Sequence, residues 1–194
     1  AVNKNKWLHY SAGVLLIILY VFTLVLALFS EDLDYIWLLP ALFGGYYCAD
    51  LLSGVSHFVL DYTRTRPGVG LRELYFYKGD KGSEDYLAKR KKVMAKISPF
   101  EKIAYDFKTH HLSPGALARR SFLRLVLPAI YPVSYPFCLI ALMILLSGWG
   151  FPEVALFILM IGFGLTICQY SHSCSHQQNP GVIPKFLQKI RLFM

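Results

Sequence analysis

The chain has 194 residues, a length that fits one domain. Hydrophobic residues make up 55% of it and charged residues 16%. A soluble domain carries about 25% charged residues, so the composition argues against a soluble protein and predicts a membrane protein. The net charge of +8 would also suit a nucleic-acid-binding protein, so the placement of the charges must decide between these classes.

Four apolar segments are long enough to cross a hydrocarbon core of ~30 Å, which takes about 20 helical residues. They cover about residues 11–29, 37–57, 126–146 and 151–170. Because backbone polar groups in lipid must be satisfied within their own segment, we expect an all-α membrane fold with four transmembrane helices.

The positive charges lie on one side of this predicted bundle. All 20 Lys and Arg residues lie in the N-terminal tail, between Arg64 and Arg124, or after the last span, whereas the two short connections carry only acidic charges. The positive-inside rule therefore predicts a multi-pass protein with both termini and the loop 61–121 in the cytoplasm. This rule explains the basic loop without nucleic acid, and no nucleic-acid-binding module is recognisable.

Two helices are predicted in the loop 61–121 and one after the last span. A basic helix covers residues 84–97. Ser98, Pro99 and Glu101 predict the start of the next helix, with Ser98 as N-cap and Glu101 closing a capping box, and this helix should end near His111. Residues 184–194 place apolar side chains opposite basic ones, a pattern that suits a helix in the membrane interface.

The second predicted span carries polar residues in its C-terminal half. At about 100° per residue, a helix aligns Asp50, Gly54, His57 and Asp61 on one face. An acid inside a span is costly, so it normally faces the bundle interior and has a partner. A polar seam that only packs helices would explain Asp50 equally well.

Two further histidine pairs lie on the same predicted membrane side. His110 and His111 end the capped helix, and His172 and His176, four residues apart, share a helical face at the end of the fourth span. Either pair alone is more often a solvated surface than a set of metal ligands.

Together with His57, these pairs bring three histidine clusters to one membrane surface. Neutral imidazole is a good ligand for iron, zinc or copper. Asp50 and Asp61 could bind the metal directly or orient the imidazoles. The clusters therefore indicate a metal centre that activates oxygen beside a lipid chain.

The clusters resemble the ordered boxes of the lipid desaturase family, which includes plasmanylethanolamine desaturase (Kua-type proteins) and the plastid phosphatidylglycerol trans-desaturases. Residues 50–61 resemble its D-x-x-x-G-x-x-H-[WF]-x-x-D box, and residues 107–114 its F-x-x-H-H-x-x-P box. Residues 172–176 resemble its H-x-x-S-H segment. The resemblance covers about residues 45–194.

This resemblance implies an oxidoreductase, a desaturase that uses O2 and a di-iron centre to insert a double bond into a lipid-borne alkyl or acyl chain. It implies an electron donor such as cytochrome b5 or ferredoxin, and we expect a location in the endoplasmic reticulum with the histidine boxes on the cytoplasmic side. The iron ligands would be the five box histidines, and Asp50 and Asp61 would support them; the five are His57, His110, His111, His172 and His176. Arg119 and Arg120 would contact the lipid headgroup, although as flanking charges of the positive-inside pattern they are equally well explained.

The family pattern continues with an H-x-x-H-H box, and the chain stops at Met194 before reaching it. We therefore expect residues 1–194 to form a single desaturase-like membrane domain that is truncated before its last box. Other functions stay open: a lipid hydroxylase on the same metal site, or a non-catalytic membrane scaffold. A haem protein with His57 and His172 as axial ligands would leave the other histidines unexplained.

Overall fold

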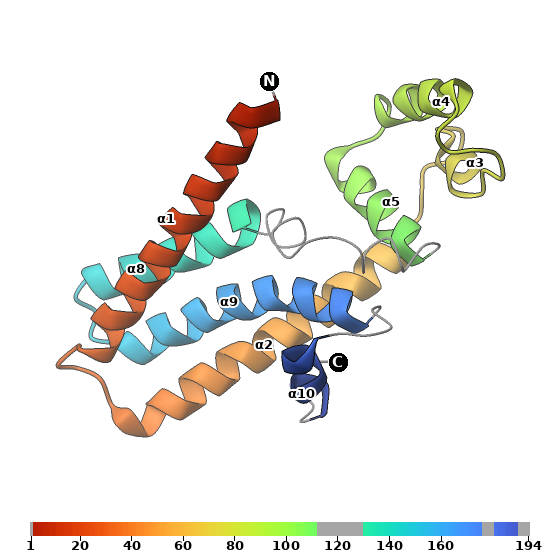
Figure 1. The fold of residues 1–194 in the computed structure, drawn as a ribbon. Coiled ribbons are helices and arrows are strands. Elements are labelled where there is room, and N and C mark those ends of the chain that lie inside the picture. The colour runs from red at the N-terminus through yellow and green to blue at the C-terminus, as the bar shows by residue number, and fades with distance from the viewer. Residues whose placement is uncertain (1, 112–129, 176–180, 190–194) are drawn as a thin grey trace. The chain divides into compact units, whose positions relative to one another are not determined.

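A computed structural model describes residues 2–111, 130–175 and 181–189 of the chain (Figure 1). All regular elements in these ranges are helices, as predicted, and no strand occurs among them. The chain divides into two compact units: unit 1 comprises Ala1–Gly54 and Ala118–Met194, and unit 2 comprises Val55–Leu117. The helices are α1 (Val2–Leu28), α2 (Tyr35–Tyr62), α3 (Leu71–Tyr75), α4 (Glu84–Met94), α5 (Pro99–His111), η1 (Ile130–Ser134), α8 (Tyr135–Leu146), α9 (Pro152–Ser175) and α10 (Val182–Lys189).

Within the described residues, three helical segments are long and apolar enough to cross a membrane: Tyr10–Leu28 in α1, Tyr35–Tyr62, which is the whole of α2, and Pro152–Cys174 in α9. They coincide with the spans predicted over residues 11–29, 37–57 and 151–170. The span predicted over residues 126–146 begins outside the described residues. Its described part forms the π-helix η1 followed by α8, and the apolar helix there is shorter than the other three.

Helices α1, α8 and α9 pack against one another in unit 1. Tyrosine hydroxyls join them by donating to backbone carbonyls: Tyr20 Oη donates to Leu159 O at 3.3 Å and Tyr135 Oη to Ala12 O at 2.7 Å. Such bonds across helices satisfy polar groups that would otherwise face hydrocarbon. An apolar cluster lies at the end of unit 1 that carries the connection between α1 and α2. Its buried members are Ala27, Leu33, Ala41 and Leu156.

Helix α2 approaches α9 through small residues. A Cβ atom added at Gly164 would lie 2.5 Å from the Cβ of Ala49, and one added at Gly45 would lie 2.5 Å from the carbonyl oxygen of Phe157. Membrane helices lack a hydrophobic drive to associate, so they rely on such close backbone approach for van der Waals contact. The two glycines therefore set the distance between α2 and α9.

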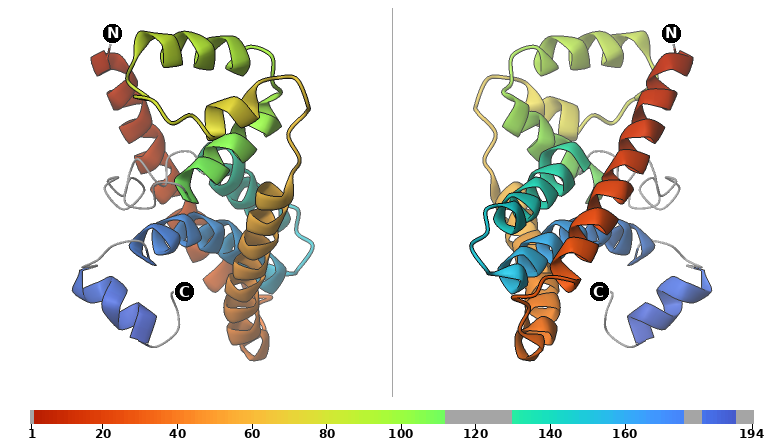
Figure 2. Two further views of the ribbon diagram at one scale, coloured as in Figure 1. Left: turned by 90° about the vertical axis from the view of Figure 1, so that its right-hand side faces the viewer. Right: turned by 90° about the vertical axis from the view of Figure 1, so that its left-hand side faces the viewer.

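Unit 2 forms its own small core between α3, α4 and α5, the yellow to green helices of Figure 2. Its buried residues are Leu71, Leu74, Tyr86, Val93, Ile97 and Tyr105. Gly70 precedes α3 with a φ of 95°, a conformation that favours glycine. The loop 61–121 is thus a compact folded unit over its described part.

The predicted helix starts in unit 2 are confirmed. Helix α4 begins at Glu84 as expected and ends at Met94, three residues before the predicted end. Helix α5 covers Pro99–His111 and begins with the predicted capping box: Ser98 N donates to Glu101 Oε2 at 2.9 Å, and Glu101 N donates to Ser98 Oγ at 3.2 Å. Of the helix predicted over residues 184–194, the structure describes α10 as far as Lys189, and its placement in the interface stays a prediction.

The glycine contact between α2 and α9 gives a first testable prediction. Gly164→Ala should lower the stability of the detergent-solubilised protein by about 1–3 kcal/mol, because the added methyl group overpacks the contact with Ala49. Gly13→Ala in α1 is the matched control, since a Cβ there meets no atom within 4 Å. Thermal unfolding monitored by circular dichroism should give a lower midpoint for Gly164→Ala alone. Equal midpoints for the two variants would contradict this packing.

Candidate functional site

Asp50 lies within unit 1 and faces α9. Its half-buried carboxylate is close enough to the Cys168 thiol to interact with it electrostatically, and the neighbouring Ser53 shares a hydrogen bond with the same thiol. An acid inside a span is expected to face the bundle interior, because lipid cannot solvate its charge. Both explanations of Asp50, a structural seam and a supporting acid, agree with this position.

His57, Phe107 and His111 form a row of rings within unit 2. The centroids of His57 and Phe107 are 4.6 Å apart with an interplanar angle of 86°, and those of Phe107 and His111 are 5.8 Å apart with an angle of 74°. Edge-to-face geometry of this kind is favourable for aromatic rings. The Nε2 atom of His57 is shielded from solvent. The first two boxes of the sequence therefore meet through Phe107.

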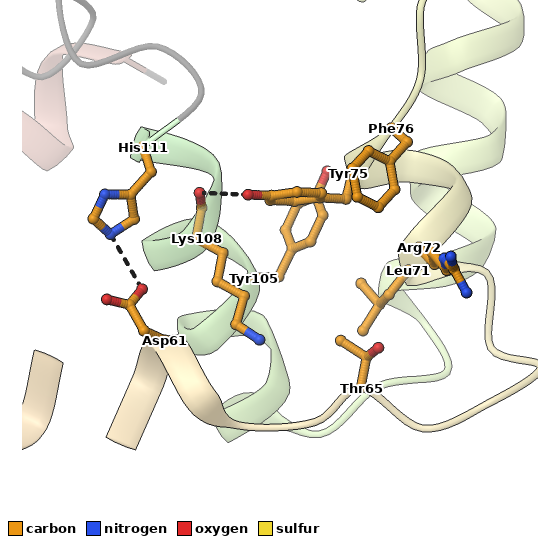
Figure 3. Close-up of a pocket in the computed structure, with 9 residues that line it drawn as sticks. All are labelled: Asp61, Thr65, Leu71, Arg72, Tyr75, Phe76, Tyr105, Lys108 and His111. Atoms are coloured by element: carbon orange, nitrogen blue, oxygen red, sulfur yellow. Dashed lines mark hydrogen bonds and ion pairs between the residues drawn. The ribbon is translucent and has the colours of Figure 1, made fainter. Parts of the chain in front are cut away.

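Asp61 and His111 make a second contact between these boxes, drawn in Figure 3. The Nε2 atom of His111 lies 3.1 Å from Oδ1 of Asp61. When Nε2 carries the proton of this hydrogen bond, the lone pair of the neutral imidazole resides on Nδ1. A carboxylate in this position fixes the tautomer and orientation of a metal-binding histidine in many proteins. The contact is the kind expected of Asp61 as a supporting acid.

Of the other predicted site residues, the structure describes the side chain of His172 but not those of the rest. His172 is half-buried in α9 of unit 1. His110 lies in the last turn of α5, but its side chain is outside the description, as are His176, Arg119 and Arg120. Among the described side chains, no group of three or more His, Cys, Asp or Glu residues is placed to hold a metal ion. The complete ligand set stays a prediction.

The donors that the structure does bring together suit a transition metal. His111 and Asp61 pair an imidazole with a carboxylate, and His57 adds a shielded imidazole in the same unit. Imidazole with carboxylate support is a donor combination found with iron, zinc and copper. The chemistry of this partial set is therefore compatible with iron, zinc or copper, and iron stays a prediction.

A clamp between Arg66 and Glu101 positions α5 in unit 2. The guanidinium donates from Nε and Nη2 to the two carboxylate oxygens of Glu101, both at 2.7 Å, and from Nη2 to Lys96 O at 3.1 Å. Hydrogen bonds from Arg66 and from the backbone of Ser98 lower the pKa of Glu101 to about 2. The segment after α2 is thereby tied to the first turn of α5, the helix that ends in His110 and His111.

A cavity of about 690 Å³ lies beside the Asp61–His111 contact in unit 2 (Figure 3). Its wall contains two cationic side chains, Arg72 and Lys108, and three aromatic rings, Tyr75, Phe76 and Tyr105. The lining consists of Asp61, Thr65, Leu71, Arg72, Tyr75, Phe76, Tyr105, Lys108 and His111. Sequence reasoning missed this feature, because residues 71–77 show no helical period and Arg72 and Tyr75 belong to no motif.

Two hydrogen bonds connect the segments that line the cavity. Lys108 donates from Nζ to Thr63 O, the carbonyl just after α2, and Tyr75 donates from Oη to Lys108 O at 3.5 Å. Burial and a hydrogen bond with Tyr86 raise the pKa of Tyr105 above its ordinary value. The Tyr105 hydroxyl is therefore protonated at neutral pH.

Comparisons with protein-family models, curated proteins and solved structures found no match to this chain. The resemblance to lipid desaturases therefore rests on the three sequence boxes. The fold of the described residues and the contacts in unit 2 stand independently of that resemblance.

The Arg66–Glu101 clamp predicts a specific pH dependence. The pKa of Glu101 is lower in the folded protein than its ordinary value of 4.5, so its contribution to stability is present above pH 4.5. That contribution is lost as the pH falls from 4.5 towards 2. Hydrogen exchange of the α5 amides, corrected for the intrinsic exchange rate, should accelerate in this window.

Glu101→Gln should produce the same faster exchange at pH 7, because the neutral amide loses the charge-assisted bonds to Arg66. Arg66→Gln should act through the same clamp, so the loss of protection in the double variant should be smaller than the sum of the losses in the two single variants. Glu84→Gln, at an exposed carboxylate in the first turn of α4, is the control. Unchanged α5 exchange in Glu101→Gln would show that the clamp does not hold this helix.

Proposed function

We propose that this chain is a membrane lipid desaturase that introduces a double bond into a lipid-borne alkyl or acyl chain, similar to plasmanylethanolamine desaturase. One observation carries the proposal: the first and second histidine boxes, about 50 residues apart in sequence, meet in unit 2 through Asp61 and His111. Membrane-spanning helices on the same chain supply the lipid environment that such a reaction needs.

The proposal includes an architecture and an orientation. Four transmembrane helices would form one desaturase-like domain, with residues 126–146 as the third span. Both termini and the histidine boxes would lie in the cytoplasm, on a membrane such as the endoplasmic reticulum. The complete absence of Lys and Arg from the two short connections supports this orientation.

Two iron ions would be held by the five box histidines, with Asp50 and Asp61 as supporting acids. Arg119 and Arg120 would contact the lipid headgroup. Bound iron would supply the activation of O2 that hydrogen abstraction from an unreactive CH2 group requires. The reaction removes two hydrogen atoms from adjacent carbons, and O2 becomes two waters with two electrons and two protons. A donor such as cytochrome b5 or ferredoxin would provide the electrons.

The protein's own contribution is to hold and orient the donors. Asp61 holds the His111 imidazole through Nε2, which would leave Nδ1 outside that contact and able to bind the metal. Phe107 packs on the edges of both His57 and His111, so neither ring can rotate without losing that contact. The apolar faces of the spans would align the substrate chain and keep water from it.

The experiment that tests the proposal is the iron content of the detergent-purified protein. We expect about two iron atoms per chain for a histidine-bound di-iron centre. His172→Ala should lose iron, whereas His9→Ala, outside the three boxes, should retain it. A folded helical protein that binds no iron would instead be the non-catalytic scaffold, and a Soret band would identify a haem protein.

Asp61→Ala gives a sharper test of the supporting role. Loss of such a partner typically costs 10–100-fold in metal affinity, so iron should dissociate at a correspondingly lower chelator concentration. Asp106→Ala, at an exposed acid of α5, is the matched control. Equal iron retention by the two variants would remove Asp61 from the site.

Product analysis separates the desaturase from the alternative lipid hydroxylase. A desaturase product is lighter than its substrate by two hydrogen atoms, whereas a hydroxylase product gains one oxygen atom. Mass spectrometry of lipids incubated with the iron-loaded protein, O2 and a reductant distinguishes these outcomes.

A further inference from the structure

The cavity between the end of α2, α3 and α5 shares Asp61 and His111 with the proposed metal site, but the cationic and aromatic part of its lining has no role in that site. We propose that it binds the phosphate of a phospholipid headgroup and so positions the lipid at the membrane surface. This inference deepens the proposed function and rests on it for the identity of the lipid as substrate. The binding itself requires neither iron nor O2.

The charges of the lining favour an anion. Among the described lining residues, Arg72 and Lys108 contribute two cations, and the one carboxylate, Asp61, is paired with His111. A guanidinium can donate two parallel hydrogen bonds to a phosphate, and an ammonium group has three hydrogens. Lys108 donates to Thr63 O, which leaves hydrogens of the same group to reach a ligand. The two cations come from different elements, Arg72 from α3 and Lys108 from α5, as Figure 3 shows.

The aromatic part of the lining suits the remainder of a headgroup. Tyr75, Phe76 and Tyr105 contribute apolar ring surface. The cavity of about 690 Å³ is within the 300–1,000 Å³ typical of sites for organic ligands, and it is much larger than a bare phosphate needs. An organic phosphate therefore matches its size as well as its charge.

The position of the cavity along α2 selects a lipid as the source of that phosphate. Helix α2 has 28 residues and so is about 42 Å long, whereas the hydrocarbon core of a bilayer is about 30 Å thick. Its last turn, which carries Asp61, therefore reaches the headgroup region when the helix crosses the membrane. Asp61 and Thr65 place the cavity at this end of the helix.

Binding can be measured on the full chain in micelles of an uncharged detergent. The probes are dihexanoyl phosphatidic acid, dihexanoylglycerol, which lacks the phosphate, and inorganic phosphate. Calorimetric titration gives the affinities, and hydrogen exchange locates the response. We expect the phospholipid to bind and to protect the amides of α3 and α5, and dihexanoylglycerol to do neither.

Arg72→Gln should weaken phospholipid binding about tenfold, the usual effect of losing one charge-assisted contact. Lys89→Gln, in the exposed charge run of α4 outside the cavity lining, should leave the affinity within about twofold. The Arg72 side chain is exposed, and a circular dichroism spectrum equal to that of the wild type confirms that the variant folds. Lys108→Arg keeps the second cation and should retain binding.

The outcomes separate this inference from the function on which it rests. Equal binding of dihexanoylglycerol, or an unchanged affinity in Arg72→Gln, overturns the phosphate site. Inorganic phosphate that binds as tightly as the phospholipid overturns the lipid as its source and assigns the cavity to a soluble phosphate. Phospholipid binding by a protein that holds no iron supports the phosphate site and refutes the proposed desaturase. Iron binding without phospholipid binding supports the metal site and refutes the phosphate site.

Discussion

The continuity of helix α2 is the constraint on which both units depend. Backbone polar groups cannot be left without hydrogen bonds in hydrocarbon, so a chain that enters the membrane must remain helical until it leaves. Helix α2 is long and apolar enough to cross a membrane, is continuous for 28 residues, and contributes its first part to unit 1 and its last part to unit 2. Polar residues that share one face of this helix are therefore fixed at different depths. Asp50 lies well inside the span against α9, whereas Asp61 lies in the final turn.

The geometry of unit 2 follows from interactions at the start of α5. The capping box of Ser98 and Glu101 fixes the residue at which the helix begins, and Arg66 ties that first turn to the segment that leaves α2. A helix rises about 1.5 Å per residue, so a fixed start also fixes the position of His111 at the other end of its 13 residues. The small core of six buried residues then holds the helix in place. The capping box, the Arg66–Glu101 contact and the packing of the small core together bring His111 to Asp61.

The elements that could be predicted from the sequence are those that local interactions determine. The spans follow from hydropathy, and the start of α5 follows from residues three positions apart. Sequence analysis failed for α3, a helix of five residues that depends on the burial of Leu71 and Leu74 against α4 and α5 and not on its own periodicity. The cavity was missed for the same reason, since α3 forms one of its walls. The boxes predicted that His57, Asp61 and His111 belong together, but their spacing along the chain carries no information on which acid contacts which imidazole. His176, Arg119 and Arg120 lie outside the described residues, so their assignments stay predictions.

Asp61 links the two proposals in physical terms. Its carboxylate contacts His111 and also lines the cavity, so the donor that would orient a metal ligand is a neighbour of the site that would hold the phosphate. An enzyme that acts on one bond of a long, uniform chain cannot recognise that bond by its own chemistry, because neighbouring CH2 groups are nearly identical. It can select the bond only by its distance from a group that it does recognise. A charged headgroup bound at the end of α2 would supply such a reference point, because a helix has a fixed rise per residue. Selectivity for the bond position would then depend on Arg72 and Lys108, which need not touch the reacting carbons, as much as on the residues that bind iron.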